Sequence, residues 1–233
     1  MKILVTGATR GIGKAIFDEL SKIADVYAVA RNEEKLKELN SAGYFVCDLS
    51  KDTRPLCEYI KSIGFDVVIN NAGEYIYGNI DKMTEEDINS IIKTNLISPI
   101  EIISASTPYM KQNKWGRIIN IGSISGVMGE AYASLYSSSK AGLIGLTKAL
   151  ALELAEYNIT VNTINPGWVD TDLGISSIED SDFSKEEILE TIPQRRFVEP
   201  VEIANMVKYL ISDEAKGITG QSINICAGLS VGI

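Results

Sequence analysis

The chain has 233 residues, a formal net charge of −9, 45% apolar residues and no histidine. This charge argues against a general affinity for nucleic acid or anionic membranes, and no run approaches the ~18 consecutive apolar residues of a membrane span. The absence of histidine excludes Ser-His-Asp and Cys-His triads and the usual ligand sets of zinc hydrolases, so proton chemistry must use Tyr, Lys, Asp, Glu or water.

The beginning of the chain predicts a cytoplasmic protein. The apolar run Ile3-Leu4-Val5 is too short for a signal peptide. Three cysteines are few and odd in number, and they lack metal-ligand spacing. We therefore expect reduced structural thiols and no metal site.

Short runs rich in Val and Ile alternate with helical patterns along the whole chain. Seven runs predict strands, at residues 2–6, 25–30, 44–47, 66–70, 117–121, 159–164 and 222–225. The clearest helical patterns span residues 85–109, 137–156 and 199–210. Such runs are typical of strands buried on both faces of a parallel sheet, joined by right-handed crossovers. We expect an α/β, doubly wound, Rossmann-type three-layer sandwich with a seven-stranded parallel sheet, formed by residues 1–233 as a single domain.

The first predicted strand runs into a glycine-rich turn, Thr6-Gly7-Ala8-Thr9-Arg10-Gly11-Ile12-Gly13, which opens a helix. Such a turn lets the backbone approach a pyrophosphate, and the helix N-terminus offers N–H groups to it. The alternative is a turn that binds nothing. The position of the turn at the start of an alternating β/α chain favours a dinucleotide site.

One long stretch, residues 167–193, lacks a clear periodic pattern. Long irregular segments in compact domains are often lids over active sites, and disorder is the alternative reading. We expect a substrate lid here.

Tyr136 and Lys140 lie four residues apart at the start of a predicted helix, so their side chains share one helix face. An ammonium near a phenol favours the phenolate, which makes Tyr136 a candidate general acid/base. A surface pair is the alternative.

Ser123 ends the fifth strand, at the edge of the sheet where ligands bind. Asn95 lies within a predicted helix, for either a structural or a functional reason.

The chain resembles the short-chain dehydrogenase/reductase family in its compact single-domain form. The matching motifs occur in the order and spacing of the family: Thr6-Gly7, Gly11-Ile12-Gly13, Asn70-Asn71-Ala72-Gly73, Asn95, Ser123, Tyr136 with Lys140, and Pro166-Gly167 with Thr171. The resemblance implies that Tyr136 exchanges a proton with the substrate oxygen and that Ser123 hydrogen-bonds this oxygen. It also implies that Lys140 binds the nicotinamide ribose and lowers the pKa of Tyr136, while Asn95 keeps a water in a relay behind Lys140. Hydride passes directly between cofactor and substrate, so neither metal nor histidine is needed.

The end of the second strand indicates the cofactor. An acidic residue there commonly binds the ribose 2′-OH of NAD, but this chain has Ala30 followed by Arg31. Arg10 can reach the same ribose, and two guanidinium groups suit a 2′-phosphate. A solvated Arg31 is the alternative, with Glu33 and Glu34 as rival acids. We predict NADP, and hence a reductase in cells.

The resemblance also assigns the remaining cofactor contacts, with Asp48 and Leu49 beside the adenine and Val169 and Thr171 beside the carboxamide. The full set expected to bind the cofactor is Gly7, Thr9, Arg10, Gly11, Ile12, Gly13, Arg31, Asp48, Leu49, Asn71, Ala72, Gly73, Tyr136, Lys140, Pro166, Gly167, Val169 and Thr171.

Within the family, the chain is most similar to 3-oxoacyl-(acyl-carrier-protein) reductases, which implies an acyl-thioester substrate and acyl carrier protein as a partner. An acidic carrier needs a basic patch on a chain of net negative charge. Five residues are candidates for this patch: Lys111, Lys114, Arg117, Arg195 and Arg196. The alternatives are a dehydrogenase of a sugar, polyol or other secondary alcohol and, in another class, a non-catalytic dinucleotide-binding regulator.

The compact family usually forms homotetramers, which pair the helices expected at 85–109 and 137–156. Both segments carry more apolar residues than one buried face requires, namely Ile88, Ile91, Ile92, Leu96, Leu143, Leu146, Leu150 and Leu154. The apolar tail 227–233 would be costly to expose. We expect a homotetramer, with a dimer or a monomer as the alternatives.

Overall fold

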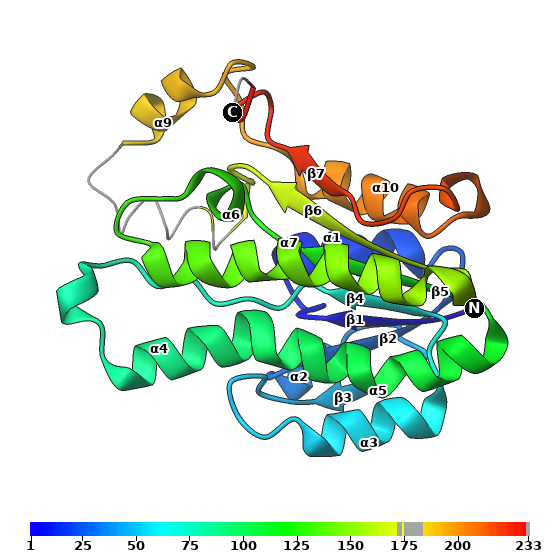
Figure 1. Ribbon diagram of the computed structural model, residues 1–233. Coiled ribbons are helices and arrows are strands. Elements are labelled where there is room, and N and C mark those ends of the chain that lie inside the picture. Colours follow the sequence, from blue (N-terminus) through cyan, green and yellow to red (C-terminus); the bar gives the residue numbers. More distant parts are fainter. Residues whose placement is uncertain (172–173, 175–183, 232–233) are drawn as a thin grey trace.

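Seven parallel strands form one sheet at the centre of the computed structural model, which describes residues 1–171, 174 and 184–231 (Figure 1). The order of the strands is β3-β2-β1-β4-β5-β6-β7. Their bounds are β1 Lys2–Thr6, β2 Asp25–Ala30, β3 Gly43–Val46, β4 Val67–Asn70, β5 Gly116–Ile121, β6 Ile159–Pro166 and β7 Ser222–Ile225. The order reverses direction between β1 and β4, which is where doubly wound folds bind their ligands. The predicted seven-stranded parallel sheet is confirmed.

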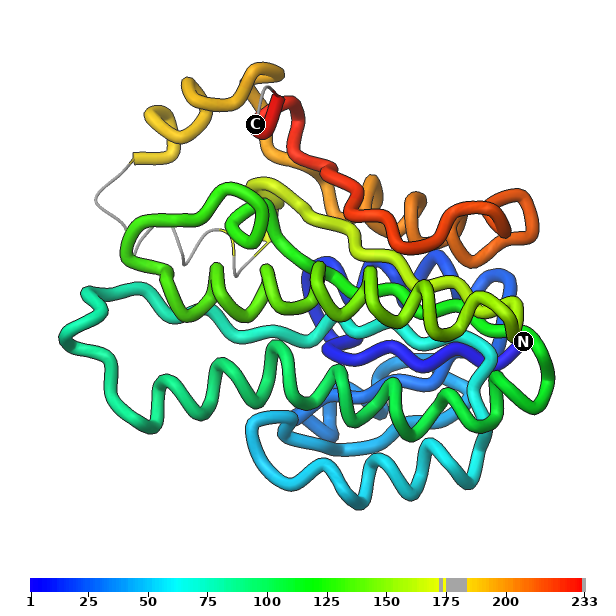
Figure 2. The backbone as a smooth tube through the Cα atoms, viewed as in Figure 1, coloured from blue at the N-terminus to red at the C-terminus, as the bar shows by residue number. Residues whose placement is uncertain are grey.

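Helices cover both faces of the sheet and complete the three layers (Figure 2). One face packs against α1 Gly11–Leu20, α2 Glu33–Lys37 and α10 Pro200–Leu210. The other face is covered by α3 Arg54–Ile63, α4 Glu85–Ile92, α5 Ser98–Asn113 and α7 Ser134–Leu154. A short helix, α6 Ser125–Met128, packs against α7 beyond the end of β5.

The alternation of side chains along the strands divides the core between the two faces. In β1, Ile3 and Val5 pack toward α1 and α10, whereas Leu4 packs toward α3 and α5. All three side chains are fully buried, and each contributes about 1.5–3 kcal/mol relative to an exposed position. This two-sided packing holds the carboxyl ends of the central strands in fixed positions at one edge of the sheet.

The helix predicted over residues 85–109 is not one regular helix. It comprises α4, a π-helical turn at Lys93–Ile97, and α5, which continues to Asn113. The Ser98 N–H bonds to the carbonyl of Lys93, five residues back, and Pro99 has no N–H with which to continue the regular ladder. The π turn carries Asn95, consistent with the frequent location of such turns at functional sites.

Several other predicted boundaries shift by one to three residues, including those of β3, β4, β5 and β6. The helix expected at 137–156 is α7, which begins at Ser134 and ends at Leu154. Within the expected lid, residues 185–191 form helix α9, Lys185–Thr191, because Ser184 and Glu187 form a capping box at its start. Residues 172–173 and 175–183 of this segment lie outside the described residues, so the lid stays a prediction. In the described part of the chain, no helix is long and apolar enough to cross a bilayer.

Candidate active site

A cleft of about 1010 Å³ opens at the carboxyl ends of β1, β4, β5 and β6. Ser123 lines it together with every residue expected to bind the cofactor, from Gly7 in the glycine-rich turn to Thr171 after β6. Segments far apart in the sequence therefore meet at the edge of the sheet where the motifs predict a dinucleotide. Asn95 lies behind the wall of the cleft.

The glycine-rich turn is shaped to bring backbone close to a ligand. Gly7 has a φ of +68°, which favours glycine, and a Cβ on Gly13 would lie 2.1 Å from the carbonyl oxygen of Gly7. Arg10, at the N-cap of α1, makes no side-chain capping bond, and the first turn of α1 has no acidic residue. This helix N-terminus at the cleft fits an anionic diphosphate.

Thr6 and Asn71 connect the glycine-rich turn to the end of β4. The Thr6 hydroxyl accepts the N–H groups of Asn71 and Ala72, both at 3.0 Å, and Asn71 Nδ2 donates to the carbonyl of Thr6 at 2.9 Å. The motifs predict a cofactor contact for Asn71 and no separate role for Thr6. The structure shows that both side chains also hold two strand ends in register.

The candidate catalytic groups lie on neighbouring elements. Ser123 follows β5 and is buried, Tyr136 lies in the first turn of α7, and Lys140 lies one turn further along α7. Lys140 is only 3% exposed, and its Nζ donates to the carbonyl of Ile121 at 2.9 Å. The Nζ lies 5.6 Å from the centroid of the Tyr136 ring. The predicted pair is therefore directed into the cleft and is not a surface pair.

Burial dominates the titration of both groups. Burial lowers the pKa of Lys140 to about 8. It raises the pKa of Tyr136 to about 12, against a hydrogen bond with Ser123 that lowers it, and the charge of Glu130 raises it further. The expectation of a lowered pKa for Tyr136 was therefore wrong for this structure, because burial and the charge of Glu130 outweigh the lowering by the Ser123 hydrogen bond.

Asn95 connects the π turn to the loop after β4. Its Oδ1 accepts the Glu74 N–H at 2.8 Å, while its Nδ2 donates to the Glu74 carbonyl at 2.8 Å and to Ser139 Oγ at 3.1 Å. A Cβ on Gly73 would lie 3.3 Å from Lys140 Nζ and 3.5 Å from Asn95 Oδ1, so both atoms face the same small space. Glu74 and Ser139 were not predicted, because backbone and hydroxyl partners leave no signal in the sequence.

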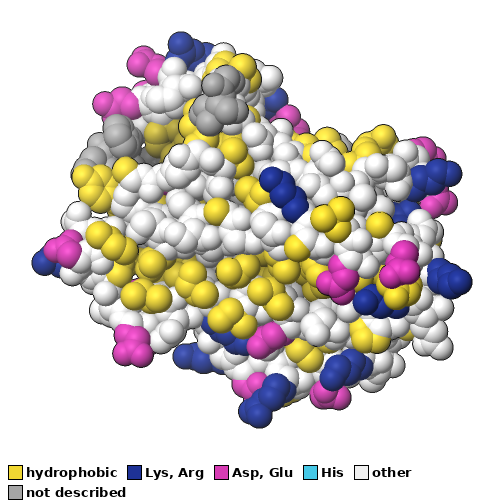
Figure 3. Space-filling model, viewed as in Figure 1, with side chains coloured by type: hydrophobic (Ala, Val, Ile, Leu, Met, Phe, Trp, Pro, Cys, Tyr) yellow, Lys and Arg dark blue, Asp and Glu magenta, His cyan; other side chains and the backbone are white. Residues whose placement is uncertain are grey.

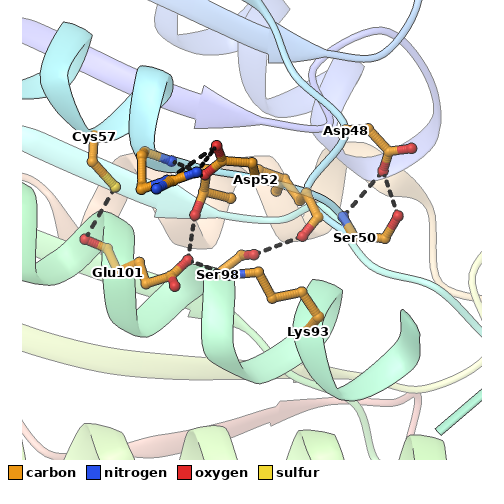
Figure 4. Close-up of polar contacts among 10 residues, drawn as sticks. Asp48, Ser50, Asp52, Cys57, Lys93, Ser98 and Glu101 are labelled. Atoms are coloured by element: carbon orange, nitrogen blue, oxygen red, sulfur yellow. Dashed lines mark hydrogen bonds and ion pairs between the residues drawn. The ribbon is translucent and has the colours of Figure 1, made fainter. Parts of the chain in front are cut away.

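The two arginines lie at the opposite end of the cleft. Arg10 and Arg31 are exposed, and within the described part of the chain neither makes an ion pair. Asp48 accepts the N–H and the hydroxyl of Ser50, at 3.0 and 2.8 Å (Figure 4). Burial raises the pKa of Asp48, but the Ser50 bonds and the Arg31 charge lower it more, so the carboxylate form is favoured.

A polar network connects this end of the cleft with the π turn (Figure 4). Ser98 Oγ donates to the carbonyl of Leu49 at 2.7 Å. Glu101, on α5, accepts Lys93 Nζ at 2.6 Å and also the hydroxyl of Thr53. These contacts fasten both ends of the π turn and so contribute to the placement of Asn95.

Comparisons with known proteins agree on one family. The sequence pattern described as short chain dehydrogenase matches residues 1–182. The 3-oxoacyl-[acyl-carrier-protein] reductase FabG of Staphylococcus epidermidis is 38% identical over 97% of this chain and 97% of its own length. The chain belongs to the short-chain dehydrogenase family. It is therefore an oxidoreductase that acts on C=O/CH–OH groups with a nicotinamide dinucleotide.

Solved structures of short-chain dehydrogenases share the whole fold. A variant of actinorhodin polyketide ketoreductase, solved with NADPH, has a TM-score of 0.89 and 35% identity over 99% of this chain and 97% of its own. A 4-hydroxyisoleucine dehydrogenase, solved with NADH, has a TM-score of 0.92 and 29% identity over 100% of this chain and 99% of its own. Similar structures thus occur with either cofactor.

One of the five basic residues considered for carrier docking is not available on this short-chain dehydrogenase. Arg117 is 1% exposed, stacks on Trp115 with 4.4 Å between its Cζ and the ring centroid, and donates to the carbonyls of Gly116 and Asn158. The alternation of side chains along β5 directs Arg117 into the protein. The expectation of a surface patch that includes Arg117 was therefore wrong. Lys111 and Arg196 lie at the surface, beside Glu153 and Glu202 respectively.

The buried ammonium gives a prediction for the stability of this short-chain dehydrogenase. A free lysine titrates near pKa ~10.4, and burial lowers the pKa of Lys140 to about 8. Between these values the unfolded chain binds more protons than the folded one, so this group makes the wild type more stable as pH rises. Lys140→Met lacks the effect. Its stability relative to wild type should therefore fall between pH ~7 and ~10, by on the order of 3 kcal/mol.

Denaturant unfolding of both proteins across this range measures the difference. A stability difference that does not change with pH, or one that grows in favour of the variant, would contradict the buried charge.

Proposed function

We propose that this enzyme is an NADPH-dependent carbonyl reductase and that it reduces a 3-oxoacyl thioester. The observation that carries the proposal is the convergence of Ser123, Tyr136 and Lys140 on one wall of the cleft. Arg10 and Arg31 lie at the other end of the cleft and have no ion-pair partners in the described residues. They support NADPH over NADH, because a 2′-phosphate offers them charge-assisted bonds that a hydroxyl cannot.

The chain itself handles the proton and the orientation of the substrate. Ser123 and Tyr136 hydrogen-bond the carbonyl oxygen, and Tyr136 donates the proton as the oxygen becomes an alcohol. Lys140 binds the ribose hydroxyls, and Asn95 holds the relay that returns a proton from solvent. A bound NADPH would supply the hydride to the carbonyl carbon. The uncapped start of α1 fits the diphosphate of such a cofactor.

The substrate half of the cleft favours an acyl group over a sugar. Its lining is rich in aromatic and apolar side chains, namely Tyr75, Tyr77, Met128, Tyr132, Trp168 and Leu229. Tyr77 and Tyr132 pack against each other with ring centroids 5.5 Å apart. Sugars and polyols need several polar partners, and the FabG relative is named as a reductase of 3-oxoacyl-[acyl-carrier-protein]. A polyol dehydrogenase is the second candidate, because Glu74 and Glu130 also line the cleft.

A substrate panel separates these candidates. The purified protein is mixed with NADPH and, in turn, a 3-oxoacyl thioester on a small thiol, the same acyl group on acyl carrier protein, a ketose and a simple ketone. We expect consumption of NADPH fastest with the thioesters. Preference for the ketose would support the polyol reading, and binding of NADPH without turnover on any carbonyl would support a regulator. A gain on the carrier over the small thiol would indicate docking of the carrier protein.

We further propose a homotetramer. A band of apolar side chains crosses the face formed by α4, α5 and α7 (Figure 3). Ile91, Leu143 and Leu154 are buried beneath it, but Ile88 is 40% exposed and Leu152 is 85% exposed. Exposed apolar area of this kind favours association.

Light scattering tests the assembly. We expect a mass four times the 25.4 kDa of one chain, and Leu152→Glu should shift it toward smaller species, because the charge would be buried at the contact. Tyr209→Glu, at an exposed position on the other face of the sheet, is the matched control. A wild-type mass near one chain would refute the tetramer.

A further inference from the structure

The carboxylate of Glu130 lies in the substrate half of the cleft, in the loop between α6 and α7. Its Oε1 accepts the hydroxyl of Tyr75 at 2.7 Å, and its Oε2 accepts the hydroxyl of Ser125 at 2.6 Å. The Glu130 backbone N–H donates to Ser137 Oγ at 3.1 Å, which fixes the loop to α7. Across the described ranges, no Lys or Arg forms an ion pair with this carboxylate.

Both partners of Glu130 contact the candidate catalytic groups. The ring of Tyr75 packs edge-on against the ring of Tyr136, with centroids 5.0 Å apart and an interplanar angle of 74°. On the other side, Ser125 Oγ lies 3.1 Å from Ser123 Oγ, and the Ser125 N–H donates to the same Ser123 oxygen at 3.1 Å. The Glu130 carboxylate thus holds Tyr75, which packs against Tyr136. It also holds Ser125, which bonds to Ser123.

We propose that Glu130 is a positioning residue that keeps Tyr136 in its protonated, proton-donating form. The inference rests on the proposed reductase function, in which Tyr136 gives its proton to the substrate oxygen. Glu130 acts through charge and through the direction of a chain of hydrogen bonds.

The direction of the chain follows from donor and acceptor capacity. A carboxylate only accepts, so the Ser125 hydroxyl donates to it, and Ser125 Oγ is then left to accept the hydrogen of Ser123. Ser123 also partners the Tyr136 hydroxyl. Without substrate, the Ser123 hydrogen is directed to Ser125, which weakens its donation to a Tyr136 phenolate. A carbonyl substrate would accept this hydrogen in place of Ser125. Breaking the chain therefore frees Ser123 to donate to the phenolate and strengthens the lowering of the Tyr136 pKa that the Ser123 bond already causes.

The charges around Tyr136 act in the same sense. Burial and the negative charge of Glu130 both raise its pKa. Lys140, from α7, opposes them only while it is protonated, and burial lowers its pKa to about 8. Tyr75 faces Tyr136 as a neutral phenol, because burial and the bond to Glu130 raise its own pKa. Glu74, the other carboxylate of this part of the cleft, accepts the hydroxyl of Ser90 on α4.

The test is a direct titration of Tyr136 that needs no substrate. Carbon-13 NMR of protein labelled at the tyrosine ring carbon that bears the hydroxyl follows ionisation, and the Tyr136 signal is assigned by its loss in Tyr136→Phe. In Glu130→Gln the midpoint for Tyr136 should fall by about one pH unit. Ser125→Ala breaks the chain but keeps the charge, and it should lower the midpoint by less. Glu38→Gln, at an exposed position, removes a distant charge and should leave it unchanged.

An unchanged or higher midpoint in Glu130→Gln overturns the proposal. If Glu130→Gln does not fold, Ser125→Ala decides it by the same criterion. A pH profile supplies a second readout, because the alkaline decline of reduction should move to lower pH in Glu130→Gln. Failure of the wild type to reduce any carbonyl would refute the proposed function and would leave the titration result standing, so the two failures are distinguishable.

Discussion

Tyr136→Phe is expected to lower the rate of carbonyl reduction by about 10²–10⁴-fold, the usual contribution of a positioned proton donor. Only the phenol oxygen is lost. The ring still packs against Tyr75, so the fold and the affinity for NADPH should be retained. Steady-state rates with the preferred substrate of the panel, together with fluorescence titration of NADPH, measure the two properties separately.

Tyr209→Phe is the matched control, because it removes a phenol oxygen at an exposed position outside the cleft. It should keep turnover within a few-fold of the wild type. Near-normal turnover in Tyr136→Phe would refute the mechanism, whereas loss of NADPH binding in that variant would show that the substitution disturbs the whole cleft.

Arg31→Ala should weaken NADPH by about 10–100-fold and leave NADH nearly unchanged. A hydrogen bond to a charged group contributes ~1.5–3 kcal/mol, which corresponds to this range of affinity, and only NADPH carries the 2′-phosphate. Arg10→Ala should act in the same direction. Side-by-side titrations of both cofactors against wild type and variants measure the effect.

Arg54→Ala serves as the control for removal of an exposed guanidinium, since Arg54 pairs with Asp52 away from the cleft. It should change neither affinity. A wild type that already prefers NADH, or an equal loss for both cofactors in Arg31→Ala, would contradict the assignment of the two arginines.

The sheet and the outline of the cleft could be predicted because their signals are local. Each central strand is a short apolar run buried on both faces, such as Val67-Val68-Ile69 of β4, and only a parallel sheet covered by helices buries such runs. The glycine-rich turn could be predicted for the same reason, because the backbone conformation that it needs depends on adjacent residues. Once the strands are parallel, their carboxyl ends must meet, and with them Ser123 and Tyr136.

The remaining features depend on contacts between residues far apart in the chain. The helical periodicity of residues 85–109 continues through Asn95, but the π turn there is fixed by bonds to Glu74 and Ser139. Likewise, Glu130 shows no motif, and its importance comes from Tyr75, 55 residues away. The raised pKa of Tyr136 was missed because burial and the charge of Glu130, which both raise it, depend on the fold and not on the local sequence.

The most direct test of the proposed reductase uses NADPH that carries deuterium at the transferred position of its nicotinamide ring, together with a 3-oxoacyl thioester. Mass spectrometry of the product locates the label. We predict a 3-hydroxyacyl thioester with one deuterium on the former carbonyl carbon, formed by wild type and nearly absent with Tyr136→Phe. No hydroxyacyl product, or a product without the label, would contradict direct reduction of the thioester substrate in this cleft.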